Sequence, residues 1–93
     1  MKIKVTFLAT YRDITGTSET VVDMEGDTIG DVLDALVREY GDKFKDEVLD
    51  PDGNIRNHVK IFRNGNFIDR KAPLKNPVSE GDTLAIIPPI MAG

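Results

Sequence analysis

The chain has 93 residues, of which 16 are acidic and 12 basic, and a formal net charge of −4. It contains no cysteine, which excludes disulfides, zinc–thiolate sites and a cysteine nucleophile. The acidic balance argues against nucleic acid or an anionic membrane as a partner. No apolar run approaches the roughly 20 residues of a membrane-spanning helix, and no signal-peptide pattern follows Met1. These features predict a cytoplasmic protein with a single domain over residues 1–93.

The first segments have the period of strands. The segment 2–9 alternates, and its apolar face carries Ile3, Val5 and Phe7, as expected for a half-buried strand. The polar segment 10–18 predicts a loop. The segment 19–24 predicts a second strand with Val22 and Met24 inward, paired with the first as an antiparallel hairpin through a wide turn.

Apolar residues then recur at helical spacing. They fall on one stripe of an amphipathic helix, formed by Ile29, Val32, Leu33, Leu36, Val37 and Tyr40. Thr28 is the expected N-cap, with Asp31 three residues later as in a capping box, and Gly41 fits the helix end. The segment 42–49 predicts a short turn that adds three residues to the core, namely Phe44, Val48 and Leu49.

The second half of the chain predicts three more strands. The segment 58–69 contains two of them around an Asn64-Gly65 turn, and after a connection the segment 83–88 forms the last. Together the segments predict an α+β fold, with a mixed four- to five-stranded sheet and one main helix packed on one face. If the first and last strands lie side by side at the centre of the sheet, the connection between them is long and the C-terminus leaves from the middle of the sheet.

Few residues suggest catalysis or metal binding. His58 is the only histidine, and its place beside a turn favours a structural role. One triplet resembles the start of a calcium loop, but Ile55 stands where that loop requires glycine; the triplet is Asp50, Asp52 and Asn54. We predict no metal site. A small basic spot has the composition of a solvated connection, and it consists of Arg70, Lys71 and Lys75.

The last six residues predict a projecting tail. Two consecutive prolines favour an extended backbone, and glycine allows close approach to another protein. The tail that we expect to leave the domain consists of Pro88, Pro89, Ile90, Met91, Ala92 and Gly93.

The chain resembles the MoaD/ThiS sulfur carriers, which are small ubiquitin-like β-grasp proteins. The resemblance covers nearly the whole sequence and rests on four motifs in order: KIKVTFLATYRDITG, GDTIGDVLDALVREY, RNGNFI and EGDTLAIIPPIMAG. The segment PDGNIRNHVKIFRNG also resembles the branch that holds archaeal small modifiers and bacterial cysteine-biosynthesis carriers. The family usually ends in Gly-Gly, whereas here Ala92 precedes Gly93.

The resemblance implies a carrier that is not itself an enzyme. An adenylating enzyme of the ubiquitin-activating (MoeB/ThiF) type would use ATP to join the Gly93 carboxylate to AMP. Sulfur would then replace AMP and leave a thiocarboxylate, so the chain would bind no cofactor of its own. The expected role is the small subunit of molybdopterin synthase, beside the large subunit, although a cysteine precursor, a thiazole precursor or transfer RNA could receive the sulfur.

Two other functions remain open at this point. One is a ubiquitin-like modifier joined to lysines of target proteins through Gly93. The other is an interaction domain whose terminus is inert.

A docking surface is predicted on the face of the sheet that the helix leaves open. By strand alternation, three apolar side chains point away from the core: Leu8, Phe62 and Ile87. Clustered there, they would bind a partner. A bulge or a one-residue register shift would instead turn them inward.

Overall fold

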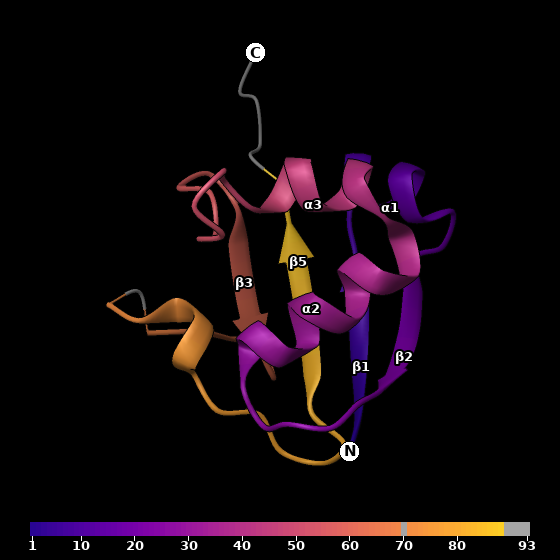
Figure 1. Ribbon diagram of the computed structural model, residues 1–93. Coiled ribbons are helices and arrows are strands. Elements are labelled where there is room, and N and C mark those ends of the chain that lie inside the picture. Colours follow the sequence, from indigo (N-terminus) through magenta and orange to yellow (C-terminus); the bar gives the residue numbers. More distant parts are fainter. Residues whose placement is uncertain (70, 89–93) are drawn as a thin grey trace.

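The computed structural model describes residues 1–69 and 71–88. Its sheet has the strand order β2-β1-β5-β3-β4 (Figure 1). The strands are β1 (Lys2–Phe7), β2 (Glu19–Asp23), β3 (Lys60–Arg63), β4 (Asn66–Phe67) and β5 (Thr83–Ile87). The two central strands, β1 and β5, are parallel, and the other neighbouring pairs are antiparallel. The predicted mixed sheet is confirmed, and the first and last strands lie adjacent at its centre.

Helix α2 (Ile29–Tyr40) crosses one face of this sheet (Figure 1). Its predicted start is confirmed: the Thr28 hydroxyl oxygen accepts the Asp31 N–H at 3.2 Å, and the Asp31 carboxylate accepts the Thr28 N–H at 3.2 Å. The Asp31 carboxylate also accepts from the Thr28 hydroxyl at 2.9 Å and from the Asp27 N–H at 3.0 Å. The bonds that the carboxylate accepts hold the pKa of Asp31 below its ordinary value, and the one from the Thr28 hydroxyl is the largest cause. A side chain at Gly26 would place its Cβ 2.3 Å from the Asp31 carboxylate, so the capping box requires glycine there.

The core lies between α2 and the sheet. Every residue predicted to face inward from a strand is buried: Ile3, Val5, Phe7, Val22, Met24, Val59, Ile61, Leu84 and Ile86. The predicted stripe of α2 is buried from Ile29 to Leu36 and half-buried at Val37 and Tyr40. The Phe7 ring is in edge-to-face contact with the rings of Tyr40 and Phe44, with centroids 5.6 and 5.9 Å apart.

The prediction of a loop over residues 10–18 was wrong. Residues Thr10–Thr15 form helix α1. The helix is preceded by Ala9, whose φ angle is 51°, and is followed by Gly16. Tyr11 anchors α1, because its side chain is buried and its ring centroid lies 6.4 Å from that of Phe44. The burial of one large aromatic side chain therefore stabilises a helix in a segment whose polar composition is typical of a loop.

The expected short turn after α2 is a helix of its own. It is α3 (Asp42–Val48), and it follows the Gly41 that ends α2. The three residues predicted to reach the core from this segment do so: Phe44, Val48 and Leu49 are all buried. None of the helices within the described residues is long and apolar enough to cross a membrane.

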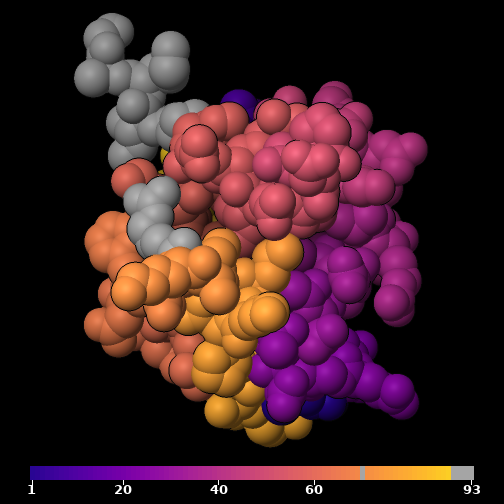
Figure 2. Space-filling view, turned by 60° about the vertical axis from the view of Figure 1, so that its left-hand side comes forward, coloured from indigo at the N-terminus to yellow at the C-terminus, as the bar shows by residue number. Residues whose placement is uncertain are grey.

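The connection from β4 to β5 packs against the start of α2, on the side that Figure 2 turns forward. It contains a short 3₁₀ helix, η1 (Pro73–Lys75). The Ile29 N–H donates to the Asn76 carbonyl at 2.9 Å, and the Val78 N–H to the Asp27 carbonyl at 2.8 Å. The Ile29 N–H and the Asp27 carbonyl lie at the start of α2, where backbone groups lack hydrogen-bond partners within the helix. The connection supplies those partners.

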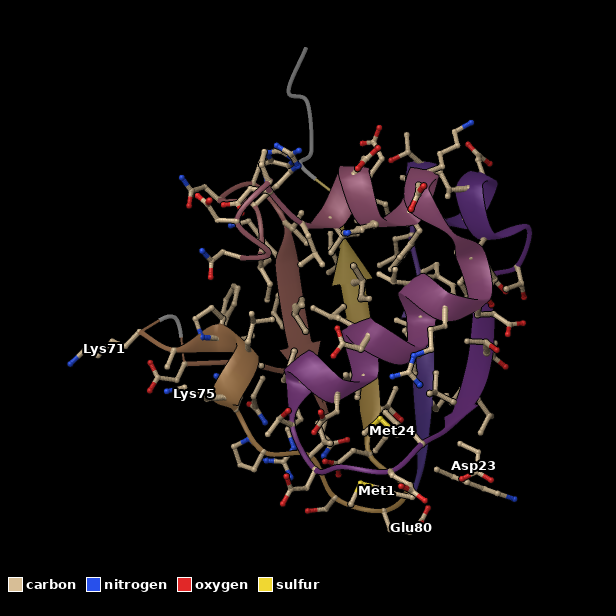
Figure 3. All side chains as sticks on the ribbon, viewed as in Figure 1. Met1, Asp23, Met24, Lys71, Lys75 and Glu80 are labelled. Atoms are coloured by element: carbon tan, nitrogen blue, oxygen red, sulfur yellow. The ribbon has the colours of Figure 1, made fainter. Side chains whose placement is uncertain are left out.

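The ends of β1 and β2 meet at one end of the sheet (Figure 3). There the Met1 amino group donates to the Met24 carbonyl at 2.9 Å and lies 3.6 Å from the Asp23 carboxylate. Lys71 and Lys75 lie on the connection at one side of the molecule and are exposed (Figure 3). The third residue of the predicted basic spot, Arg70, lies outside the described residues.

Candidate docking face

The sheet face opposite α2 carries an apolar band, which the register of the strands assembles. Ala85 of β5 is opposite Phe62, and Phe62 is opposite Phe67. Leu8 follows the pair Phe7–Ile86, which places it level with Ile87. The apolar band is thus formed by Leu8, Phe62, Phe67, Ala85 and Ile87.

The three side chains predicted for this face are all brought to it. Leu8 is 41% exposed, whereas Phe62 and Ile87 are half-buried. Phe62 is partly covered because its ring lies on that of Phe67, with centroids 4.3 Å apart and planes inclined at 37°. A partner bound to this face would remove the exposed part of these apolar side chains from water.

Phe67 is a member of the apolar band that sequence analysis missed. Phe67 is 64% exposed, more than its half-buried neighbour Phe62. The available signal was the Asn64-Gly65 turn, whose φ values of 51° and 84° are those of a two-residue hairpin loop. Such a turn puts Phe67 directly opposite Phe62, because it fixes the register.

The apolar band covers the half of the face formed by β5, β3 and β4 and reaches the end of β1 only at Leu8. On the β1–β2 half, the Lys4 ammonium pairs with the Glu19 carboxylate at 3.2 Å. Val21 is 62% exposed there, beside Lys4 across the strand pair. The open face of the sheet is therefore apolar on one half and carries an ion pair on the other. The apolar band thus has a polar rim on one side, as protein-binding surfaces do.

A buried carboxylate fixes the position of the β3–β4 hairpin against β5. The Asp82 side chain accepts from the Arg63 Nε at 2.6 Å, the Asn64 amide at 3.0 Å and the Ser79 N–H at 2.7 Å. The Asn64 amide oxygen in turn accepts the Thr83 N–H at 2.9 Å. Asp82 thus holds Phe62 and Phe67 in register with β5.

These hydrogen bonds also set the charge state of Asp82. The bond from the Asn64 side chain is the largest cause that holds the pKa of Asp82 below its ordinary value of 3.8. The Ser79 N–H and Arg63 lower the pKa further, while burial opposes them. Asp82 is therefore ionised at neutral pH.

The predicted tail falls mostly outside the described residues. Pro88 is described and is buried, directly after the central strand β5. The other tail residues lie outside the described part of the chain: Pro89, Ile90, Met91, Ala92 and Gly93. Within residues 1–69 and 71–88, no group of three or more His, Cys, Asp or Glu side chains could hold a metal ion.

The architecture defines the class of protein. A mixed five-stranded sheet with parallel central strands and one main helix across a face is the ubiquitin-like β-grasp fold, which the structures of its neighbours share. The chain belongs to the ThiS family, whose model matches residues 5–93.

Similar proteins cover the whole length of the chain. It is 35% identical to small archaeal modifier protein 1 of Haloferax volcanii over 86 residues, which are 91% of this chain and 93% of that protein. It is 32% identical to the molybdopterin synthase sulfur carrier subunit of Drosophila yakuba over 94 residues, covering 100% of this chain and 92% of that protein. The crystal structure of SAMP1 from Haloferax volcanii superposes with a TM-score of 0.87 at 31% identity, over 100% of both chains.

Proposed function

We propose that this chain is a sulfur carrier whose Gly93 carboxylate is adenylated and then converted to a thiocarboxylate. The observation that supports this most is the ThiS family match, which extends to residue 93. In this proposal residues 1–93 are one domain, of which residues 88–93 are the tail that enters the activating enzyme. Because activation consumes ATP, the proposal also implies a cytoplasmic protein.

The activation chemistry explains why a chain without cysteine can carry sulfur. A carboxylate oxygen of Gly93 attacks the α-phosphorus of ATP, and pyrophosphate leaves. Hydrosulfide from the sulfur donor then attacks the carbonyl carbon, AMP leaves with the bonding electrons, and loss of the S–H proton gives the thiocarboxylate. The activating enzyme, of the MoeB/ThiF type, supplies the catalytic groups, so the chain presents only a reactive end.

For the acceptor we propose a molybdopterin precursor, with this chain as the small subunit of the synthase beside its large subunit. The support is the similarity to the sulfur carrier subunit of Drosophila yakuba. The second candidate is a modifier joined to lysines of target proteins, supported by the similarity to small archaeal modifier protein 1. The two functions share the adenylation step and differ only in the group that attacks the activated end.

The test of the carrier proposal uses the activating enzyme from the same organism, ATP and a sulfur donor, with intact-protein mass spectrometry. The wild-type chain should gain the mass difference of one oxygen replaced by sulfur, at Gly93. Deletion of Gly93 shortens the reach by about 3.3–3.6 Å, and a one-residue extension displaces the carboxylate. Both changes should abolish conversion, because the reaction needs close alignment.

The Ala92→Gly variant should react as well as the wild type, since it restores the usual family ending. If only Ala92→Gly is converted, the Ala92-Gly93 ending is degenerate or truncated. If neither is converted, the carrier proposal fails and an interaction domain with an inert terminus takes its place. Addition of the synthase large subunit with a molybdopterin precursor, or of target proteins, then separates sulfur transfer from conjugation to lysine.

We also propose that the apolar band docks the activating enzyme. Phe62→Ala removes its central ring and should raise the KM for the carrier at least tenfold. Since the ring is only half-buried, the free energy of unfolding should fall by about 1 kcal/mol. Val21→Ala, an exposed change on the other half of the same face, is the matched control. Loss of several kcal/mol in Phe62→Ala would mark Phe62 as a core residue and refute the docking role.

A further inference from the structure

A small hollow adjoins the apolar band at the edge of the sheet. It lies between β3 and the chain that follows β4, and its volume is about 90 Å³. Its apolar walls are formed by Ile55, Val59, Ile61, Phe67, Ile68 and Pro73. Because Phe67 belongs both to these walls and to the apolar band, the hollow and the band form one continuous surface.

Two positively charged side chains line this hollow. Arg56 and Lys60 line it, and no acidic residue is among its described lining residues. Neither cation takes part in an ion pair within residues 1–69 and 71–88, although the chain as a whole is acidic. The Arg56 Nε donates to the Asp46 carbonyl at 2.8 Å, and the Lys60 ammonium lies 5.9 Å from the Phe67 ring centroid. Both charges therefore have fixed neighbours but no carboxylate partner in the described part of the chain.

The size of the hollow limits what can occupy it. Sites for small molecules and nucleotides commonly enclose about 300–1,000 Å³, several times this volume. One aliphatic or aromatic side chain would fill the hollow, and the flanking cations would meet a carboxylate next to that side chain. The geometry thus favours a segment of another protein over a free ligand.

We propose that the hollow receives an apolar side chain flanked by a carboxylate on the activating enzyme. This inference rests on the proposed carrier function. That function assigns the activating enzyme to this chain whether the final acceptor is a cofactor precursor or a lysine. The apolar side chain enters between Phe67 and Ile68, and the carboxylate pairs with Lys60 and Arg56. The hollow then selects the partner, while the apolar band supplies most of the buried area.

The test measures the KM for the carrier in the adenylation reaction at two ionic strengths, about 0.05 M and about 0.5 M. Lys60→Glu should raise the KM at least tenfold at the lower ionic strength and much less at the higher, because salt screens the charge pair. Lys43→Glu makes the same charge change on α3 and should leave the KM within twofold of wild type at both.

A second pair of variants tests the shape of the hollow. Ile68→Phe places a larger side chain at its wall and should raise the KM at least fivefold at both ionic strengths. Ile68→Val keeps the hollow open and should have a KM near that of wild type. Thermal melting of each variant verifies that the fold is intact.

The outcomes separate this inference from the carrier proposal. If the wild type is not adenylated, the carrier proposal fails and this inference falls with it. If the wild type is adenylated but Lys60→Glu and Ile68→Phe match it at both ionic strengths, only the inference about the hollow is wrong. An equal effect of Lys43→Glu and Lys60→Glu would also overturn it, because net charge would then account for the change.

Discussion

The hydroxyl group of Tyr11 is buried without a hydrogen-bond partner among the described residues. Its ring fills the space between α1 and α3, where it contacts Phe44. Burial, with a smaller contribution from the Glu47 carboxylate, raises the pKa of Tyr11 to about 12. The ring therefore stabilises the fold, whereas the hydroxyl group loses its hydrogen bonds to water.

The first prediction concerns this hydroxyl group. Tyr11→Phe keeps the ring and removes the unsatisfied polar atom, so the free energy of unfolding should stay equal or rise by about 1 kcal/mol. Urea unfolding at neutral pH measures it, and a loss above about 1 kcal/mol would reveal a hydrogen bond.

The pH dependence provides a second readout of the same variant. In the wild type, the unfolded chain loses the tyrosine proton near pH 10 while the folded chain keeps it to about pH 12. Stability should therefore fall across this interval, and this contribution to the fall should be absent in Tyr11→Phe. Tyr40→Phe, at a half-buried ring, is a matched control.

The second prediction concerns Asp82. Asp82→Asn weakens charge-assisted hydrogen bonds from Arg63, Asn64 and Ser79, and it should lower the free energy of unfolding by about 1–3 kcal/mol at pH 7. Since folding lowers the pKa of Asp82, its contribution is present above the unfolded value near 4 and lost as pH falls through the folded value. As pH falls below about 4, the free energy of unfolding should therefore decrease less steeply in Asp82→Asn than in the wild type. Identical pH profiles of the two proteins would contradict this.

Among the elements, α2 depends most on its buried stripe. Leu33 and Leu36 are each 1% exposed, and Asp at either position would bury a charge with no partner. The third prediction is that Leu33→Asp or Leu36→Asp lowers the free energy of unfolding by about 4 kcal/mol or more and abolishes cooperative melting. Arg38→Asp, on the exposed side of α2, should cost less than about 1 kcal/mol. Circular dichroism during heating distinguishes these outcomes.

The strands β1, β2, β3 and β5 and helix α2 could be predicted from the sequence because each has a clear period. Alternation revealed the inward faces, and the spacing from Ile29 to Tyr40 revealed the helix with its Thr28 cap. Helix α1 could not be predicted this way, since a single aromatic residue, Tyr11, carries its contact with the core. A segment of six residues is too short for a helical period to become visible.

The candidate site was predictable in part for the same reason. Alternation placed Leu8, Phe62 and Ile87 on the open face, but Phe67 lies on a strand of two residues, which is too short to alternate. The contacts of Asp82 join residues 63–64 with residues 79–83 and depend on the register of two strands. The hollow likewise joins residues 55–61 with residues 67–73, so only the tertiary structure could reveal it.

At the scale of the whole molecule, stability is expected to be highest at the centre of the sheet. Strands β1 and β5 each have a neighbour on both sides, whereas β4 has two residues and one neighbour. The fourth prediction is that amide hydrogens of β1 and β5 exchange only through global unfolding, and those of β4 through local opening at a lower free energy. Hydrogen exchange followed by NMR measures both. Equal protection in β4 and β5 would contradict the prediction.

The central position of β5 has a consequence for biosynthesis. Every other element leaves the ribosome before β5, yet β1 and β3 have no neighbour on their facing edges until β5 inserts between them. Until residue 87 has been translated, the nascent chain therefore exposes two strand edges, which are sites of aggregation. Insertion of β5 closes this gap and brings Ala85 and Ile87 to the open face in the same step. A protein that recognises this face thus meets only chains whose translation has passed residue 87.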